Sequence, residues 1–155
     1  MKTSEAGKNL IRESEGLRLE AYRCAAGVVT IGYGHTEGVQ MGQSISAAEA
    51  ERLLEQDLWR CERLLNTMGI PFRQGQFDAL ASFIFNLGGG TFVSSTLCKK
   101  IQRGAADEEV AAEIVKWVHG GGKVLPGLQR RRVREANMYL GCERYAVKNK
   151  KIVRL

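Results

Sequence analysis

Three side chains near the start of the chain have types and spacings that suit hydrolytic chemistry. Glu15 carries a carboxyl, Cys24 follows after eight intervening residues, and Thr30 follows after five more. A carboxyl that is partly buried keeps its proton to a higher pH and can act as a general acid. Cys24 stands where a hydrolase with paired carboxylates would place its second acid. Taken singly, the three are equally compatible with a helix-end glutamate, a buried thiol and a strand threonine, so the hypothesis depends on their arrangement.

A short helix and a small sheet must position these residues. Apolar side chains recur at helical spacing over residues 3–11, with Ser4 as a plausible N-cap, and Glu15 follows near the helix end. The segment 28–34, VVTIGYG, is β-branched and aromatic before it breaks at glycines. Such a pattern is typical of strand and turn, so a small antiparallel sheet is expected around Thr30.

The rest of the chain reads as helical. A capping box at residues 46–49 opens a long helix that runs to about Met68. The segment 76–87 is apolar nearly all round and predicts a buried central helix. Further helices are expected over 107–118, with Asp107 as cap, and over 129–140, with a loop between them.

These elements predict an α+β fold within a single domain, residues 1–155. A β-rich lobe spans about 14–45, and a helical lobe spans about 70–145 together with the N-terminal helix. The long helix joins the lobes, and a cleft is expected between them.

Composition narrows the choice of partners. The chain has 155 residues, 44% of them hydrophobic, and a net charge of +6, which suits nucleic acid, an anionic membrane or an acidic cell wall. No apolar run is long enough to span a membrane, and the first residues lack the apolar core of a secretory signal. The basic runs 129–132 and 148–151 lack a nucleic-acid motif, so they are interpreted as a solvated helix face and a frayed tail. Four cysteines without CxxC spacing predict no metal site.

The spacing of Glu15, Cys24 and Thr30, followed by GYGHT, resembles the catalytic stretch of phage-type lysozymes, the endolysins of glycoside hydrolase family 24. That family has an aspartate, or sometimes a cysteine, at the second position. The segments EGLRLEAY and TIGYGHT are also similar to the family. Residues 76–101 and 116–140 resemble its central helix and C-terminal segment, so the resemblance extends over roughly residues 9–141.

The resemblance implies a lysozyme-like fold and a muramidase that cuts the β-1,4 bond between N-acetylmuramic acid and N-acetylglucosamine in peptidoglycan. Glu15 would protonate the leaving oxygen, while Thr30 and, less effectively, Cys24 would hold the attacking water. No cofactor is expected. The positions that match substrate-facing or cleft-wall residues of the family are Tyr33, His35, Phe85, Asn86 and Thr96.

Several alternatives remain open at this stage. Cys24 as a thiolate could attack the sugar, or it could be silenced by oxidation and restored by reduction. An arginine of the run 130–132 would bind wall carboxylates or pair with Glu15. Rival functions are a non-catalytic or redox-silenced peptidoglycan-binding module, a lytic transglycosylase and a nucleic-acid-binding protein. The favoured hypothesis is a monomer that binds bacterial peptidoglycan, without nucleic acid or stable membrane insertion. It would be made in the bacterial host cytoplasm and act on the wall or periplasm by an unspecified export route.

Overall fold

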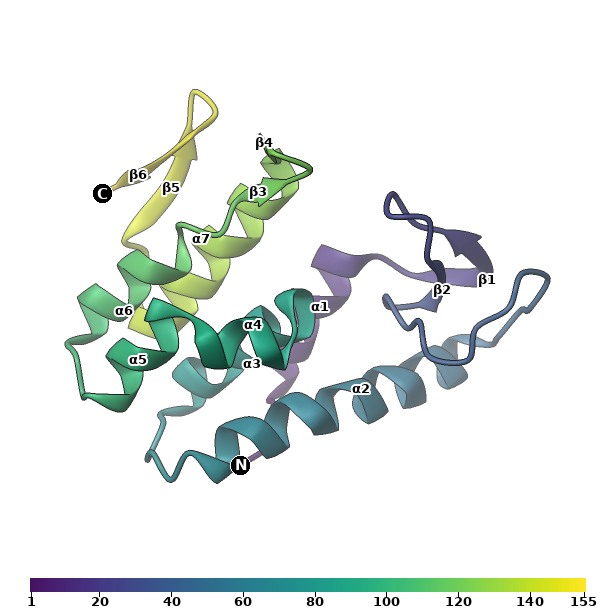
Figure 1. Cartoon of the computed structure of the whole chain (residues 1–155), viewed down its shortest axis with the longest axis horizontal. Helices are drawn as coiled ribbons and strands as arrows, with labels where there is room; N and C mark the ends of the chain where they lie inside the picture. Colours follow the sequence, from purple (N-terminus) through teal and green to yellow (C-terminus); the bar gives the residue numbers. More distant parts are fainter.

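The computed structural model describes residues 1–155 and contains seven α-helices and three two-stranded antiparallel sheets (Figure 1). In chain order these are α1 (Glu5–Glu15), β1 (Arg18–Arg23), β2 (Val29–Gly32), α2 (Ala47–Thr67), α3 (Gln74–Leu87), α4 (Gly89–Ser94), α5 (Thr96–Gln102), α6 (Asp107–Ile114), β3 (His119–Gly120), β4 (Lys123–Val124), α7 (Pro126–Leu140), β5 (Tyr145–Lys148) and β6 (Lys151–Arg154). A small lobe around β1 and β2 faces a larger helical lobe, and α2 connects the two. The predicted fold class is confirmed.

The small lobe places the end of β1 beside the start of β2. The strands pair antiparallel, with Arg23 opposite Val29 and Tyr22 opposite Thr30. Cys24 opens the turn between them, where its N–H donates to the Val28 carbonyl at 2.9 Å. The predicted sheet is therefore present, and its tight turn brings Cys24 and Thr30 into one short hairpin.

The long helix α2 begins where the capping box predicts. The Ser46 side chain accepts a hydrogen bond from the Glu49 N–H at 3.1 Å, which satisfies one of the free donors of the first turn. Its 21 residues correspond to a rod of about 30 Å, which extends from the small lobe along the helical lobe (Figure 1).

The core lies in the helical lobe, around α3. Twenty-three buried residues form one cluster, and nine consecutive residues of α3, 76–84, are buried. The buried Asp78 carboxylate accepts from the Ser4 N–H at 2.9 Å, from the Ser4 hydroxyl and from Gln74. A Cβ at Gly7 would lie 2.7 Å from Asp78, so this glycine lets α1 approach α3 closely. These contacts fix α1, which carries Glu15 at its end.

Three helix boundaries differ from their predictions. Helix α1 ends at Glu15, so the carboxylate belongs to the helix and does not follow it. The N-cap of α6 is Ala106 and not Asp107. Asp107 lies in the first turn of the helix, where its carboxylate accepts hydrogen bonds from the side chains of Arg73 and Gln76. Helix α7 starts at Pro126, three residues before the predicted start, because proline is well suited to the first helical position.

Two segments expected to be irregular are hairpins. The predicted loop after α6 contains β3 and β4, which turn at Gly121 and Gly122, both with positive φ. The predicted frayed tail is wrong as well: residues 148–151 form the turn of the β5–β6 hairpin. Tyr145 of that hairpin is buried in the core, which explains why the segment is ordered. No helix combines the length and apolarity needed to cross a bilayer.

Candidate active site

Glu15 lies at the junction of the two lobes. It is the last residue of α1, and the turn continues through Gly16, which has positive φ. Its side chain is 20% exposed, so the carboxylate is reachable but largely enclosed. Gly34, in the turn after β2, passes so close that a Cβ there would lie 2.7 Å from the Glu15 Oε1 atom. The turn therefore forms one wall against the carboxylate.

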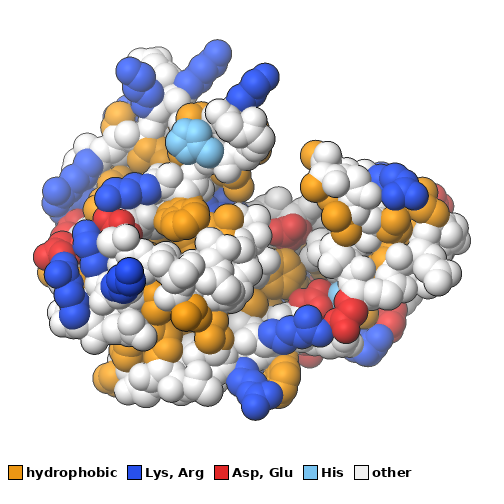
Figure 2. Space-filling model, viewed as in Figure 1, with side chains coloured by type: hydrophobic (Ala, Val, Ile, Leu, Met, Phe, Trp, Pro, Cys, Tyr) orange, Lys and Arg blue, Asp and Glu red, His pale blue; other side chains and the backbone are white.

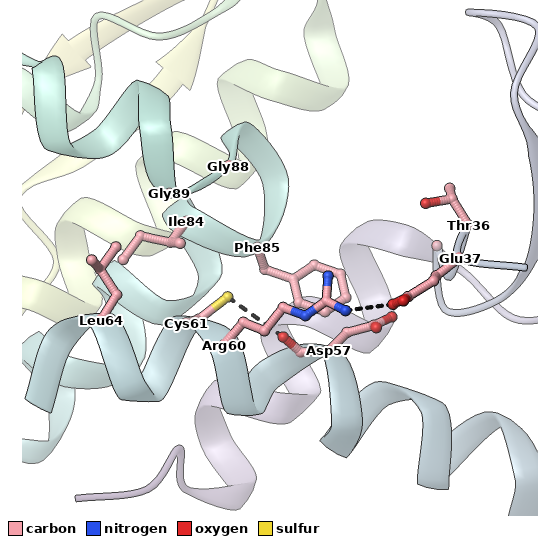
Figure 3. Close-up of a pocket in the computed structure, with 11 residues that line it drawn as sticks. Thr36, Glu37, Asp57, Arg60, Cys61, Leu64, Ile84, Phe85, Gly88 and Gly89 are labelled. Carbon is pink, nitrogen blue, oxygen red and sulfur yellow. Dashed lines mark hydrogen bonds and ion pairs between the residues drawn. The ribbon is translucent and has the colours of Figure 1, made fainter.

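Glu15 lines one cavity, and Gly34, which lies against Glu15, lines a second; the space-filling view shows a hollow between the lobes (Figure 2). The first has a volume of about 540 Å³ and is lined by Gly34, Thr36, Glu37, Asp57, Arg60, Cys61, Leu64, Ile84, Phe85, Gly88 and Gly89 (Figure 3). The second, of about 450 Å³, is lined by Ser14, Glu15, Asn86, Leu125, Pro126, Gly127, Leu128 and Arg131. Phe85 and Asn86, consecutive at the end of α3, contribute to one cavity each.

Arg131 holds the Glu15 carboxylate from the α7 side. Its guanidinium pairs with Glu15 through Nη1 and is only 4% exposed. The same guanidinium reaches the Glu135 carboxylate at 3.3 Å and donates to the Ser82 carbonyl at 3.1 Å. Because Arg131 is anchored on two further sides, it fixes the position of Glu15. This contact selects Arg131 among the arginines of the basic run as the partner of Glu15.

A buried ionic pair lies behind this contact. The side chains of Arg132 and Glu135 are both fully buried, 2.9 Å apart between Nη1 and Oε1. Desolvation raises the pKa of the Glu135 carboxyl, and the two adjacent arginines oppose that rise. Desolvation also lowers the pKa of Arg132, which donates to the Asn86 side-chain oxygen. Asn86 thus lines a cavity, and its side chain is held in place by a hydrogen bond from the buried Arg132.

Thr30 and Cys24 are brought together in the small lobe. The Thr30 side chain is buried, and its hydroxyl donates to the Val28 carbonyl at 2.9 Å, which leaves its lone pairs free to accept. Hydrogen bonds from the backbone of Val28 and Ala26 lower the pKa of the Cys24 thiol. The turn therefore makes Cys24 more acidic than an ordinary thiol.

Three further residues were predicted at the site, namely Tyr33, His35 and Thr96, and each lies in a different environment. Tyr33 is partly buried against the core. His35 is buried, with Nδ1 2.8 Å from an Asp57 carboxylate oxygen and Nε2 3.0 Å from the Glu37 carbonyl. Both ring nitrogens of His35 are thus engaged by the protein. Thr96 is exposed at the start of α5. Of the predicted site residues, Glu15, Phe85 and Asn86 line the two cavities, and Cys24, Thr30, Tyr33, His35 and Thr96 line neither.

Sequence reasoning missed the contribution of α2 to the first cavity. Asp57, Arg60, Cys61 and Leu64 line it from one face of the helix, and Arg60 pairs with Glu37 across its mouth (Figure 3). Their spacing of three or four residues was the available signal, since such positions share a helix face. Burial raises the pKa of the Cys61 thiol to about 12, so this sulfur stays protonated. No three His, Cys, Asp or Glu side chains gather as a metal site.

Known proteins share both the sequence and the fold. The phage lysozyme family matches residues 12–135. The endolysin of Acyrthosiphon pisum secondary endosymbiont phage 1 is 42% identical over 144 residues, which cover 90% of this chain and 98% of that protein. The solved endolysin of Escherichia coli O157:H7 phage FAHEc1 is 36% identical, with a TM-score of 0.82 over 90% of this chain and 94% of that one.

The muramidase domain of SpmX from Asticaccaulis excentricus has the same TM-score of 0.82, with 37% identity over 90% of this chain and 97% of that one. These relatives favour a hydrolase over a non-catalytic wall-binding module. The chain therefore belongs to the phage lysozyme family, and its activity is the hydrolysis of peptidoglycan.

Proposed function

We propose that Glu15 is the general acid of this hydrolase and protonates the glycosidic oxygen that links N-acetylmuramic acid to N-acetylglucosamine. The observation that carries the proposal is its place in the wall of the smaller cavity, where it is held by Arg131 and lies against Gly34, a residue that lines the larger cavity. A glycan strand laid across Glu15 would place sugars in both cavities. Proton transfer to the leaving oxygen then accompanies cleavage of the bond between the anomeric carbon and that oxygen.

Thr30 and Cys24 hold the attacking water on the opposite face of the sugar. The Thr30 hydroxyl accepts a bond from the water, because its own proton is committed to the Val28 carbonyl. The Cys24 thiolate accepts a proton of the water as its oxygen attacks the anomeric carbon, and the lowered pKa of the thiol makes this form accessible. A water that attacks from the face opposite the leaving group inverts the anomeric configuration.

Phe85 and Asn86 are the proposed substrate contacts, whereas Tyr33 lines neither cavity and is not one of them. Phe85 offers an apolar surface in the larger cavity, while the Asn86 amide can bond a sugar in the smaller one. His35 is proposed as a positioning residue, because it ties the turn that carries Gly34 to α2 through Asp57. Thr96 lies outside both cavities and is not included in the proposed set.

The decisive test is Glu15→Gln on purified peptidoglycan, followed by turbidity and by the release of new reducing ends. We expect loss of at least about a hundredfold in rate, the usual contribution of a general acid. Glu13→Gln is a matched control, because Glu13 lies on the same helix and makes only an exposed pair with Arg134. Full activity of the Glu15 variant would refute the assignment. Products with an anhydro end in place of a reducing end would indicate a transglycosylase.

The role of Cys24 is tested by Cys24→Asp, Cys24→Ser and Cys24→Ala. If the thiolate is the working form, the rate of the native enzyme rises with pH as the thiol ionises. In the Asp variant that rise disappears, because an aspartate is already ionised above about pH 4. We expect the Asp variant to match or exceed the native rate near neutral pH, and the Ala variant to fall well below it. Equal rates in all three would show that Cys24 takes no part.

Two alternatives for Cys24 give distinct signatures. A nucleophilic sulfur would form a covalent glycosyl-enzyme and retain the anomeric configuration, which mass spectrometry and product analysis detect. A redox-controlled sulfur would make the rate depend on reductant.

The remaining expectations concern assembly and location. We propose that the chain acts as a monomer without nucleic acid, and that it is made in the bacterial host cytoplasm before it reaches the wall. Light scattering of the purified protein tests the first statement, and a dimer would contradict it.

A further inference from the structure

The C-terminal hairpin β5–β6 has a concentrated positive charge at its turn. Three of the four turn residues 148–151 are lysines, all are exposed, and none makes an ion pair. The arginines at the base of the hairpin, by contrast, both approach Glu108. Residues 144–155 contain no acidic side chain. Figure 2 shows Lys and Arg side chains projecting from the part of the helical lobe that carries the hairpins.

Two features of this turn are unfavourable for its stability: two lysines face each other, and a third lysine has a left-handed backbone conformation. Lys148 and Lys151 are directly opposite each other in the ladder, an arrangement of like charges that destabilises a strand pair. Asn149 and Lys150 have φ of 51° and 61°, in the left-handed region where glycine is favoured, and they are the only non-glycine residues with positive φ. A cation thus occupies a position at which glycine would be more stable.

The hairpin is nevertheless held firmly along α7. At its base the Asn137 side chain donates to the Tyr145 carbonyl at 3.0 Å and accepts from two N–H groups of the hairpin. At its turn the buried Gln129 side chain donates to the Lys150 carbonyl at 2.8 Å. These two anchors are eight residues apart on α7, about 12 Å along the helix. The lysines are therefore presented in a defined place.

That place is beside the substrate cleft. Gln129 lies in the first turn of α7, and the residues immediately before it, 125–128, line the smaller of the two cavities next to Glu15. A glycan strand that occupies this cavity carries peptide stems, and the carboxylates of these stems are anionic groups that the lysines of the hairpin can attract.

We infer that the turn of residues 148–151 is a second substrate contact, which binds the carboxylates of the peptide stems of peptidoglycan beside the cleft. This inference rests on the proposed function, since it takes the glycan to lie across Glu15. The positive charge of the lysines attracts the polymeric substrate, and hydrolysis takes place in the cleft. Charge attraction of this kind raises the affinity for the wall and weakens with added salt.

Binding is measured with the variant Lys148→Gln/Lys150→Gln/Lys151→Gln in a Glu15→Gln background, so that the walls are not degraded. Sedimentation with purified peptidoglycan gives the affinity. Exposed ion pairs contribute about 1.4-fold to fivefold each, so loss of three should weaken binding by roughly tenfold at low salt. The difference should shrink at high salt. The control Lys2→Gln/Arg63→Gln/Lys99→Gln removes the same charge from cations that make no ion pair elsewhere, and it should change binding less than twofold.

Glycan strands stripped of their peptides by an amidase provide the sharpest comparison. On these strands the hairpin variant and its parent should bind equally, and without the Glu15 change they should hydrolyse the strands at equal rates. A defect that persists on stripped strands would overturn the inference, as would equal loss in the control variant. Failure of Glu15→Gln to stop hydrolysis would instead overturn the proposed general acid, and the inference on the hairpin would then be tested by comparing the hydrolysis rates of the hairpin variant and its parent on intact and on stripped strands.

Lys150→Gly separates a binding role from a structural one. Glycine relieves the left-handed backbone, so the thermal midpoint should rise while binding to intact peptidoglycan falls. A rise in stability with unchanged binding would contradict the inference. Hairpin-dependent binding to vesicles of phosphatidylglycerol and phosphatidylcholine, or to a DNA duplex, without any effect on peptidoglycan would assign the surface to another partner and overturn it.

Discussion

Gly34→Ala should displace the carboxylate of Glu15, the proposed general acid, while the residue itself stays a glutamate. A Cβ at this position would lie 2.7 Å from the Glu15 Oε1 atom and 3.3 Å from its carboxyl carbon. An ordinary contact begins at 3.4 Å, so the carboxylate must retreat by about 0.7 Å. Free rotation cannot absorb this shift, because Arg131 holds the other oxygen and is itself anchored on two sides.

Two effects of this substitution must be separated. Gly34 has φ of 76°, so alanine there costs about 1–2 kcal/mol of folding free energy through backbone strain alone. Gly38 has φ of 69°, and a Cβ added there would have no atom within 4 Å, so Gly38→Ala imposes the same strain without the clash. Displacement of a reacting group by about 1 Å can cost a hundredfold in rate, which sets the expected loss for Gly34→Ala at ten- to a hundredfold.

The assay combines urea unfolding with the rate of release of reducing ends from peptidoglycan. Both variants should lose similar stability, but only Gly34→Ala should lose most of its rate, at a temperature where both are folded. If the two variants keep the same rate, the approach of the turn does not position Glu15, and the reasoning is refuted.

Three further predictions follow from the ionic and thiol groups. Arg131→Met leaves Glu15 without its partner and should cost about 3–5 kcal/mol of stability, measured by urea unfolding; a loss below about 1 kcal/mol would contradict it. The two lysine partners of Glu113 lower the pKa of its carboxyl, so this carboxylate stabilises the fold above its ordinary pKa, and that stability is lost as the pH falls through the lowered value. Glu113→Gln should therefore cost about 1–2 kcal/mol at pH 7 and nothing in strong acid, and an unchanged difference in acid would count against the ion pairs. Iodoacetamide should modify the exposed Cys142 and leave Cys61 unmodified in the native protein, as read by mass spectrometry; rapid labelling of Cys61 would show that its cavity opens.

Local signals in the sequence predicted the elements that they directly encode. Ser46 and Glu49 predicted the start of α2 because a capping box involves only neighbouring residues. The β-branched run around Thr30 predicted a strand for the same reason. The apolar segment of α3 predicted the core, since a helix that is apolar all round must be buried.

The features that the sequence left open or did not predict depend on contacts distant in sequence. Nothing local distinguishes Arg131 from its neighbours, and only the packing of α7 against α3 turns it toward Glu15. The basic run 148–151 led to the prediction of a frayed tail. The usable sign of strands was the aromatic and β-branched residues that flank this run, Tyr145 and Val147 before it and Ile152 and Val153 after it.

The ion pair between Glu15 and Arg131 also constrains when the enzyme can become active during synthesis. Its two residues are 116 positions apart, so the carboxylate at the end of the first helix acquires its partner only after the last helix has left the ribosome. Contacts of such long range form late, because the chain must close a large loop before they stabilise anything. A nascent or truncated chain that ends before α7 has Glu15 but lacks Arg131, which holds it in place, and so the proposed active site forms only after α7 has been synthesised.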